Sequence, residues 1–307
     1  MTIFIHIGAP KCATGTLQAH AFHGHPEILF YGWPPGHVTP AIQAALYCDN
    51  QYFTREVVDR ARAEARAAYG DGPKPIVLSR EHHTYHIFNA GLIADRLSQI
   101  FAGMKVILCI REQVSQLGSA YLWSLRELTR PGAEMPSDSF EAFIERNWKS
   151  FNLEETTSRN IERSAYFTAD YAAIVKQYER CIGKENIGVF VFEELVRNPD
   201  AFCQKLFGFI GVSAIHRING QRENARPTRR QYWYWWLLRM YMPTPIGGAM
   251  HRWTPSRVNN WLGRGPRMEV DLSVEWRERL AVSFAAGNRY LAETFNLPLG
   301  DYGYALA

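Results

Sequence analysis

Four short runs of apolar residues have the length and composition of strands buried on both faces of a sheet. They cover Ile3–Ile7, Pro75–Leu78, Lys105–Ile110 and Ile187–Phe192. The stretches between them are longer and follow the three-to-four-residue repeat of apolar positions that is typical of amphipathic helices. Alternation of strands and helices predicts an α/β fold with a doubly wound, mainly parallel central sheet flanked by helices.

Start and stop signals bound most of the helices that the pattern predicts. The long helix before the second strand, for example, stops at Gly70-Asp71-Gly72-Pro73. In such sheets ligands bind at the carboxyl ends of the strands, so the residues that follow each strand become the candidates for chemistry. The predicted helices are Thr14–His23, Arg55–Tyr69, Leu92–Phe101, Gln113–Leu128, Asp170–Cys181, Pro199–Ile210 and a closing helix over about Val274–Phe295.

The character of the chain changes after residue 212. We predict that residues 1–212 form the α/β core and that residues 213–307 form a basic, aromatic, helical extension packed on it as part of a single domain. The segment Tyr232–Tyr241 is densely aromatic. It has three interpretations: a buried helix, the lining of an acceptor pocket, or a peripheral contact with a membrane interface.

Composition narrows the class of protein. Of the 307 residues, 47% are hydrophobic and 21% charged, which predicts a packed core and excludes global disorder. A net charge of +4 is too small to indicate a nucleic-acid partner, but it suits an anionic ligand if basic residues converge on one site. The five cysteines are scattered and no stretch is apolar enough to span a membrane, so we expect a cytoplasmic location.

The residues after the first strand have the features of an anion-binding loop. Gly8 allows a tight turn, Lys11 carries a full charge, and the helix that starts near Thr14 offers free backbone N–H groups. Thr14 and Thr16 add hydroxyl donors beside the amides of Ala13, Thr14 and Gly15. A nucleoside-triphosphate loop of the form GxxxxGK[ST] would need Gly at 13 and Lys at 14, so a kinase-like loop fits poorly.

The segment His6–Gln18 resembles the 5′-phosphosulfate-binding loop of sulfotransferases that use 3′-phosphoadenosine 5′-phosphosulfate (PAPS). The family's pattern is roughly HIGxPKTGTTxLQ, and the matching positions are Lys11, Thr14, Thr16 and Gln18. Ala13 and Gly15 depart from it. The resemblance implies a P-loop NTPase-like three-layer fold, PAPS as the sulfuryl donor, and a loop (Lys11, Ala13, Thr14, Gly15, Thr16) that binds its 5′ end. It implies no metal.

A second nucleotide element follows the third strand. Arg111 ends that strand, and Ser119 and Tyr121 follow at the spacing Arg-x7-Ser-x-Tyr. This spacing resembles the family's 3′-phosphate-binding motif, and an Arg fork with a hydroxyl is suited to grip a phosphate that ATP lacks. The Asn-Pro that commonly follows the Arg is Glu112-Gln113 here.

The second strand is followed by candidates for acid–base chemistry. Sulfuryl transfer to a hydroxyl needs a base for the departing proton. Glu81 is the first choice, because many sulfotransferases place a catalytic Glu after this strand, and His82 is the alternative. The nearby His83 and His86 do not have the spacing of a zinc site.

The sequence thus predicts a PAPS-dependent sulfotransferase, with a carbohydrate, a lipid or a small molecule as acceptor. The alternatives are a kinase-like nucleotide enzyme and a non-catalytic protein that binds a nucleotide or a membrane surface.

Overall fold

The fold, taken from a computed structural model, is described for residues 2–32, 39–70, 72–80, 87–126, 139–151, 168–214, 226–241 and 253–307. Its centre is a five-stranded sheet in the order β2-β3-β1-β4-β5, in which every pair is parallel. The predicted α/β architecture and its four strands are confirmed. The strands are β1 (Ile3–His6), β2 (Leu29–Tyr31), β3 (Ile76–Ser79), β4 (Lys105–Ile110) and β5 (Ile187–Val191).

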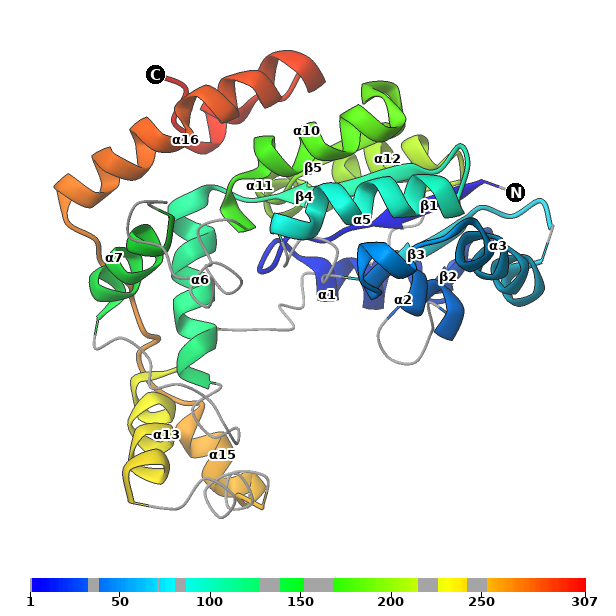
Figure 1. The fold of residues 1–307 in the computed structure, drawn as a ribbon. Coiled ribbons are helices and arrows are strands. Elements are labelled where there is room, and N and C mark those ends of the chain that lie inside the picture. The colour runs from blue at the N-terminus through cyan, green and yellow to red at the C-terminus, as the bar shows by residue number, and fades with distance from the viewer. Residues whose placement is uncertain are drawn as a thin grey trace.

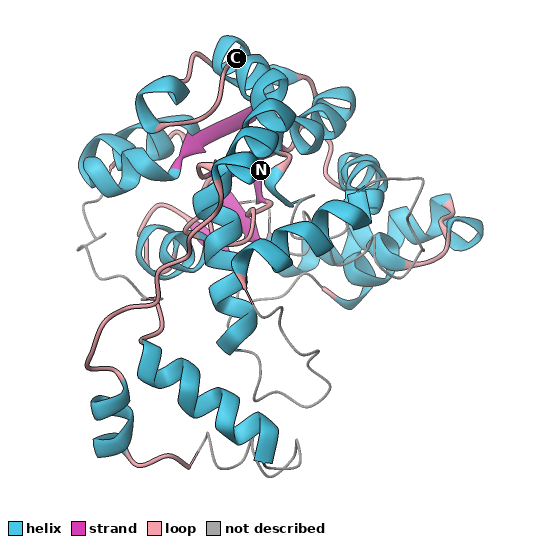
Figure 2. Cartoon of the chain, turned by 90° about the vertical axis from the view of Figure 1, so that its left-hand side faces the viewer, coloured by secondary structure: helices cyan, strands magenta, loops and turns pink. Residues whose placement is uncertain are grey.

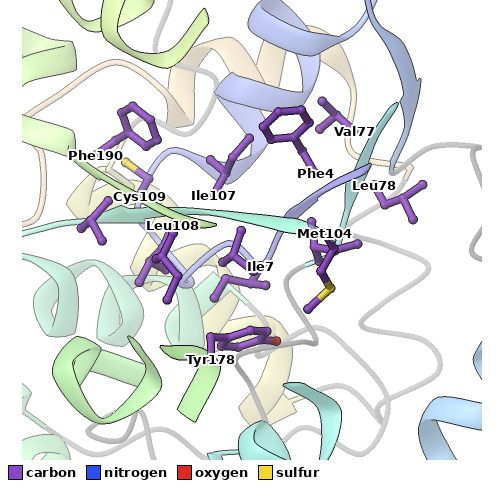
Figure 3. Close-up of a cluster of buried hydrophobic side chains, with 14 of the residues drawn as sticks. Phe4, Ile7, Val77, Leu78, Met104, Ile107, Leu108, Cys109, Tyr178 and Phe190 are labelled. Carbon is purple, nitrogen blue, oxygen red and sulfur yellow. The ribbon is translucent and has the colours of Figure 1, made fainter. Parts of the chain in front are cut away.

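Helices α5 (Ile87–Ile100), α10 (Tyr171–Ile182) and α12 (Pro199–Ile210) pack on the sheet. Alternate strand residues point to opposite faces, so each strand contributes to two layers. Figure 3 shows Ile107 and Phe4 on one side of the sheet and Leu108 and Ile7 on the other, the latter beside Tyr178 of α10. Across the first face, the rings of Phe4 and Phe209 of α12 lie 5.8 Å apart. The core therefore consists of two helical layers around the sheet.

The remaining helices differ from the predictions mainly in their bounds. The first helix is a short turn, α1 (Thr14–Thr16), that continues as the π-helical η1 (Leu17–Phe22), and α5 begins five residues earlier than predicted. Four helices were not predicted: α2 (Pro40–Tyr47), α7 (Phe140–Phe151), α15 (Ser256–Leu262) and the short α11 (Phe192–Arg197). Further helices are α3 (Arg55–Tyr69), α6 (Gln113–Arg126), α13 (Arg229–Tyr241) and α16 (Val274–Phe295).

A second, smaller hydrophobic cluster lies beyond the sheet, between α6, α7 and α16. Helix α6 runs from the sheet towards α13 and α15, which lie well away from the strands in both views of the molecule (Figures 1 and 2). Helix α16 returns to the main core, where Leu291 is fully buried. The predicted boundary at residue 212 stays a prediction.

No helix in the described ranges combines the length and the apolar character that crossing a bilayer requires.

Candidate anion-binding site

The carboxyl ends of three adjacent strands, β3, β1 and β4, lie at one edge of the sheet. β1 leads into the loop from Ile7 to Ala13, β3 ends next to Arg80, and β4 ends next to Arg111. Because β1 lies between β3 and β4, its loop is flanked on both sides. The pairing is parallel throughout, so all three strand ends face the same way.

The loop has an unusual backbone. Gly8, Lys11 and Ala13 all have positive φ, of 48°, 65° and 65°. A side chain at Gly8 would come within 2.8 Å of the Thr14 methyl carbon, so this position requires glycine. Lys11 and Ala13 occupy the left-handed region at a cost of about 1–2 kcal/mol each, because their Cβ atoms crowd the backbone. Residues of alternating hand, as at 11–14, turn successive N–H groups to one side and form an anion-binding concavity.

The carbonyl groups of this loop are held by hydrogen bonds from the surrounding protein. The Thr14 hydroxyl donates to Ala9 O at 3.2 Å, and the Gln116 amide donates to Pro10 O at 3.0 Å. The Arg111 guanidinium donates through Nη1 to Lys11 O at 3.2 Å. These bonds help to offset the cost of the positive φ angles and fix the orientation of three carbonyl groups of the loop.

Arg111 is held at the start of α6 by both polar and aromatic contacts. Its Nε and Nη2 atoms donate to the Ser115 hydroxyl at 3.0 and 2.7 Å. Its guanidinium carbon lies 4.6 Å from the centroid of the Phe192 ring. The structure thus adds Ser115 to the residues around Arg111, which the sequence motif did not identify. Ser119 lies one helical turn beyond Ser115 and is half-buried.

The Lys11 side chain lies against the face of α6 that carries Ser115 and Ser119. Its Nζ atom lies 3.7 Å from the centroid of the Trp123 ring, close enough for a cation–π interaction. Ser115, Ser119 and Trp123 follow one another at four-residue spacing, so α6 presents one stripe of side chains to the loop. The motif that follows Arg111 did not include Trp123, although its four-residue spacing from Ser119 was a signal that could have found it.

The buried Tyr171 side chain contacts both the loop after β1 and the end of β4. Its hydroxyl donates to Arg111 O at 2.9 Å and lies 3.5 Å from the Cys12 sulfur. Burial raises the pKa of Tyr171 well above its ordinary value, so the phenol stays protonated as a donor. Burial also raises the pKa of Cys109, at the end of β4, and this thiol stays neutral.

A buried polar chain lies under the loop. The Gln18 amide donates to the Ser79 hydroxyl at 2.8 Å, and Ser79 Oγ lies 2.7 Å from His6 Nδ1. A hydroxyl has one proton and two lone pairs, so Ser79 can accept from Gln18 and still pair with a neutral His6 at Nδ1. Burial lowers the pKa of His6 to about 3, in agreement with a neutral ring. The chain links the ends of β1 and β3, the strand that precedes Glu81.

The start of α6 is held by the carboxylates of Glu112 and Glu193 and by Tyr304 near the C-terminus. Glu112 accepts hydrogen bonds from the Val114 and Ser115 amides, both at 2.8 Å, and so caps the helix. Its own amide donates to Glu193, which also accepts from the Tyr304 hydroxyl at 3.1 Å. Burial raises the pKa of Glu112. Glu112 is therefore the N-terminal cap of the helix that follows Arg111.

The C-terminal helix contributes an amide pair to the same helix start. The Gln113 amide donates to Asn288 Oδ1 at 2.6 Å, and Asn288 donates back to Gln113 at 3.3 Å and to Ala305 O at 3.0 Å. Both side chains are buried.

The structure brings Lys11, Ala13, Thr14, Gly15 and Thr16 to one end of β1 and places Arg111 against Lys11. Glu81 and His82, with His83 and His86, lie outside the described residues. The neighbouring Arg80 stacks on Tyr47, with 5.6 Å between the guanidinium carbon and the ring centroid. Within the described ranges, no group of three His, Cys, Asp or Glu side chains could hold a metal ion.

No protein-family profile and no curated protein matches this sequence. Solved structures do match. The sulfotransferase of Alicyclobacillus acidocaldarius superposes with a TM-score of 0.57 at 18% identity, and the match covers 97% of each chain. The fold of this chain is that of a sulfotransferase.

Two other sulfotransferase structures match over most of their length but with lower scores. The sulfotransferase domain from the curacin biosynthetic pathway has a TM-score of 0.40 at 12% identity, over 92% of this chain and 96% of that domain. The domain from the Synechococcus PCC 7002 olefin synthase has a TM-score of 0.39 at 12% identity, over 93% and 94%. The assignment of the sulfotransferase fold rests on the Alicyclobacillus structure, which matches over both whole chains.

Proposed function

We propose that this protein is a sulfotransferase that moves a sulfuryl group from PAPS to a hydroxyl of a carbohydrate, lipid or small-molecule acceptor. The observation that carries the proposal is the hydrogen bond from Arg111 to the carbonyl of Lys11. It joins two cationic elements, 100 residues apart in sequence, at one sheet edge in a sulfotransferase fold. PAPS carries anionic groups at both its 5′ and 3′ positions, so two neighbouring cationic elements suit it.

The residues at this edge fit such a donor. The 11–14 backbone offers amides of alternating hand, and Lys11 adds a full positive charge beside them. Arg111 offers a planar fork whose position is already fixed by Ser115 and Phe192. We assign the 5′ end of the donor to residues 11 and 13–16, and the 3′-phosphate to Arg111 and Ser119.

PAPS supplies the sulfuryl group, and this chain supplies charge, orientation and a base. The oxygen of the acceptor hydroxyl forms a bond to sulfur while the bond from sulfur to the 5′-phosphate oxygen breaks. We propose that Glu81, or else His82, takes the hydroxyl proton. Lys11 neutralises the charge that develops on the departing phosphate oxygen.

The direct test incubates the purified protein with PAPS labelled in its sulfate and with hydroxyl acceptors of the three classes. Mass spectrometry then detects a gain of one sulfate on the acceptor and equimolar 3′-phosphoadenosine 5′-phosphate (PAP). Failure to transfer to any acceptor class, together with failure to bind PAP, would contradict the proposal.

Nucleotide selectivity is a second test that needs no acceptor. PAP at 100 times its dissociation constant should stabilise the protein by about 2.7 kcal/mol, and ADP should raise the melting temperature much less. Arg111→Lys keeps the charge but loses the fork, so it should weaken PAP binding about 10- to 100-fold and leave ADP binding nearly unchanged. Equal melting shifts from PAP, ADP and ATP would contradict the assignment of Arg111.

We also propose a reducing, cytoplasmic setting for the protein. All five cysteines are free thiols, and Cys12, Cys109 and Cys203 are buried. Thiols that are neither paired nor arranged around a metal are typical of proteins in a reducing compartment.

A further inference from the structure

The surface formed by α13 and α15 lies apart from the edge of the sheet that carries Lys11 and Arg111, which we call the nucleotide edge because we propose that it binds PAPS. We use the term basic-aromatic lobe for residues 226–241 and 253–268. The two segments are joined by hydrogen bonds from Arg229 N to Pro266 O, at 3.1 Å, and from Met268 N to Pro227 O, at 2.8 Å. Figures 1 and 2 both show the two helices of the lobe beside each other, far from the sheet.

The lobe is an ordered unit with a defined inner face. Thr228 and Gln231 form a capping box at the start of α13: Gln231 N donates to Thr228 Oγ1 at 3.1 Å, and Thr228 N donates to Gln231 Oε1 at 2.9 Å. The Thr228 hydroxyl also donates to Leu262 O of α15. Trp235 and Leu238 are buried, with 5% and 7% of their surface exposed. These contacts fix which side chains of α13 face outwards.

The outer face is apolar and aromatic. On α13, Trp233, Leu237, Met240 and Tyr241 recur at the spacing of one helix face and are 56%, 47%, 53% and 74% exposed. On and beside α15, Trp253 is 84% exposed, Val258 39% and Trp261 56%. Among the described residues, every strongly exposed tryptophan belongs to this lobe. Exposed apolar side chains gathered in one region mark an interaction surface.

The charge of the lobe has a single sign. Residues 224–268 contain no Asp or Glu, although the whole chain has 30 acidic residues. Six arginines of the lobe are exposed: Arg226, Arg229, Arg230, Arg257, Arg264 and Arg267. Arg230 stacks on Trp261, with 4.7 Å between the guanidinium carbon and the ring centroid. The arginines thus lie among the exposed aromatic rings.

We propose that the basic-aromatic lobe docks on the surface of a membrane that contains anionic lipids. Trp and Tyr favour the headgroup level of a bilayer, exposed Leu, Met and Val favour the acyl boundary, and Arg pairs with lipid phosphates. A second copy of the same lobe is a poorer occupant, because two all-cationic faces repel each other. A nucleic acid would match the arginines but would leave the aliphatic side chains in water. This inference does not depend on the sulfuryl-transfer proposal.

Docking would hold the edge of the sheet that carries Lys11 and Arg111 about one helix length from the lobe, because α6 reaches from one to the other. Helix α6 packs against α13 near one end, and near the other it follows directly after Arg111. Trp123 of α6 lies under the Lys11 ammonium. One helix therefore connects the docking surface with the loop.

The test measures how much of the full-length protein floats with phosphatidylcholine vesicles that contain 30% phosphatidylglycerol, and with vesicles of phosphatidylcholine alone. We expect binding to the anionic vesicles only, and we expect it to fall as salt is added. Each arginine near an anionic surface changes the partition coefficient about fivefold, so Arg257→Glu with Arg264→Glu should lower it at least about twentyfold. Trp253→Ser with Tyr241→Ser should also lower it, because both side chains are highly exposed.

The matched control is Tyr52→Ser with Arg66→Glu, which alters an exposed aromatic ring and an exposed arginine on the part of the molecule around α3. The control should float like the wild type, and all variants should keep the wild-type melting temperature within a few degrees. No flotation of the wild type, equal flotation with neutral vesicles, or an equal loss in the control would overturn the proposal. A wild-type dimer that the Trp253→Ser, Tyr241→Ser variant splits would overturn it too, because the lobe would then cover a second copy.

Discussion

The nucleotide edge and the basic-aromatic lobe depart in opposite ways from the usual distribution of polar and apolar groups. At the edge, His6, Thr14, Gln18 and Ser79 are polar and buried. In the lobe, Trp253 is apolar and exposed. The side chains of Thr14, Gln18 and Ser79 hydrogen-bond within the protein, whereas the Trp253 ring is exposed to solvent.

This difference separates two ways of preparing a surface for a partner. A site for a small anion gains from groups fixed in advance, because ordering them on binding would reduce affinity. A surface for a membrane needs exposed apolar area and charge, and it tolerates less exact placement of each group. Single substitutions at the edge should therefore weaken binding of the anion strongly. Single substitutions on the outer face of the lobe should weaken membrane binding much less.

The largest expected effect on stability contrasts two tryptophans of the lobe. Trp235→Ala should lower the free energy of unfolding by about 3–5 kcal/mol, because this side chain is buried and its removal leaves a cavity. Trp253→Ala should change it by less than about 0.5 kcal/mol, because this ring is 84% exposed. Urea denaturation measures both values. Similar losses in the two variants would mean that the exposed ring has a structural role.

At the nucleotide edge, Lys11→Ala should slow sulfuryl transfer about 10²–10³-fold without unfolding the protein, because it removes a preorganised positive charge. Steady-state rates with PAPS and an excess of acceptor measure the effect. The control is Lys74→Ala, which removes an exposed lysine at a distance from the loop. A rate within threefold of the wild type in the Lys11 variant would exclude Lys11 from the chemistry.

The buried His6 predicts a dependence of stability on pH. Its pKa is about 3 in the folded protein and about 6.5 in the unfolded chain, so between these values only the unfolded state binds the proton. The free energy of unfolding should therefore fall by about 1.4 kcal/mol per pH unit as pH drops below about 6, and the loss should end near pH 3.

Urea denaturation from about pH 7 to about pH 5 tests this expectation. His6→Gln removes the proton-binding group, so the free energy of unfolding should depend less steeply on pH in this variant. His23→Gln, which alters an exposed histidine of the same segment, should keep the wild-type slope. Equal slopes in the wild type and in His6→Gln would show that His6 is protonated in the folded state.

The smallest expected effect concerns the loop backbone. Ala13→Gly should raise the free energy of unfolding by about 0.5–1 kcal/mol, because glycine adopts a φ of 65° without steric cost. Ala9→Gly in the same loop should lower it, because Ala9 is fully buried and does not have a positive φ. Chemical denaturation shows whether each variant has a higher or a lower free energy of unfolding than the wild type. A loss of stability in Ala13→Gly would argue against strain at this residue.

The sheet was predictable because its central strands are buried on both faces and leave continuous apolar runs in the sequence. Strand β2 was not, since it has three half-buried residues at the sheet edge. The same limit applies to α15, a helix of seven residues in which Leu262 alone is buried. Elements this short contain too few residues for a periodic pattern of apolar positions to be recognised.

The placement of Lys11 and Arg111 at one sheet edge was predictable, but their contacts were not. Lys11 and Arg111 both follow strands, and the order of the elements was enough to place them at one edge. Arg111 hydrogen-bonds Ser115, whereas the sequence motif pointed to Ser119, one helical turn further along. Which serine is reached depends on side-chain rotamers, and sequence spacing does not determine these. The left-handed angles of Lys11 and Ala13 were unforeseen for a related reason: non-glycine residues rarely adopt them unless tertiary contacts require it.

The contacts at the start of α6 also bear on the order in which the protein is completed during synthesis. Arg111 precedes a helix whose first turn is tied to Asn288 and, through Glu193, to Tyr304. A ribosome adds about 5–20 residues per second, so Arg111 emerges well before these partners exist. The sheet can form on the nascent chain, but the arginine fork gains its final setting only when the closing segment arrives. A chain interrupted before residue 288 would therefore have the strands of this fold without a finished nucleotide edge.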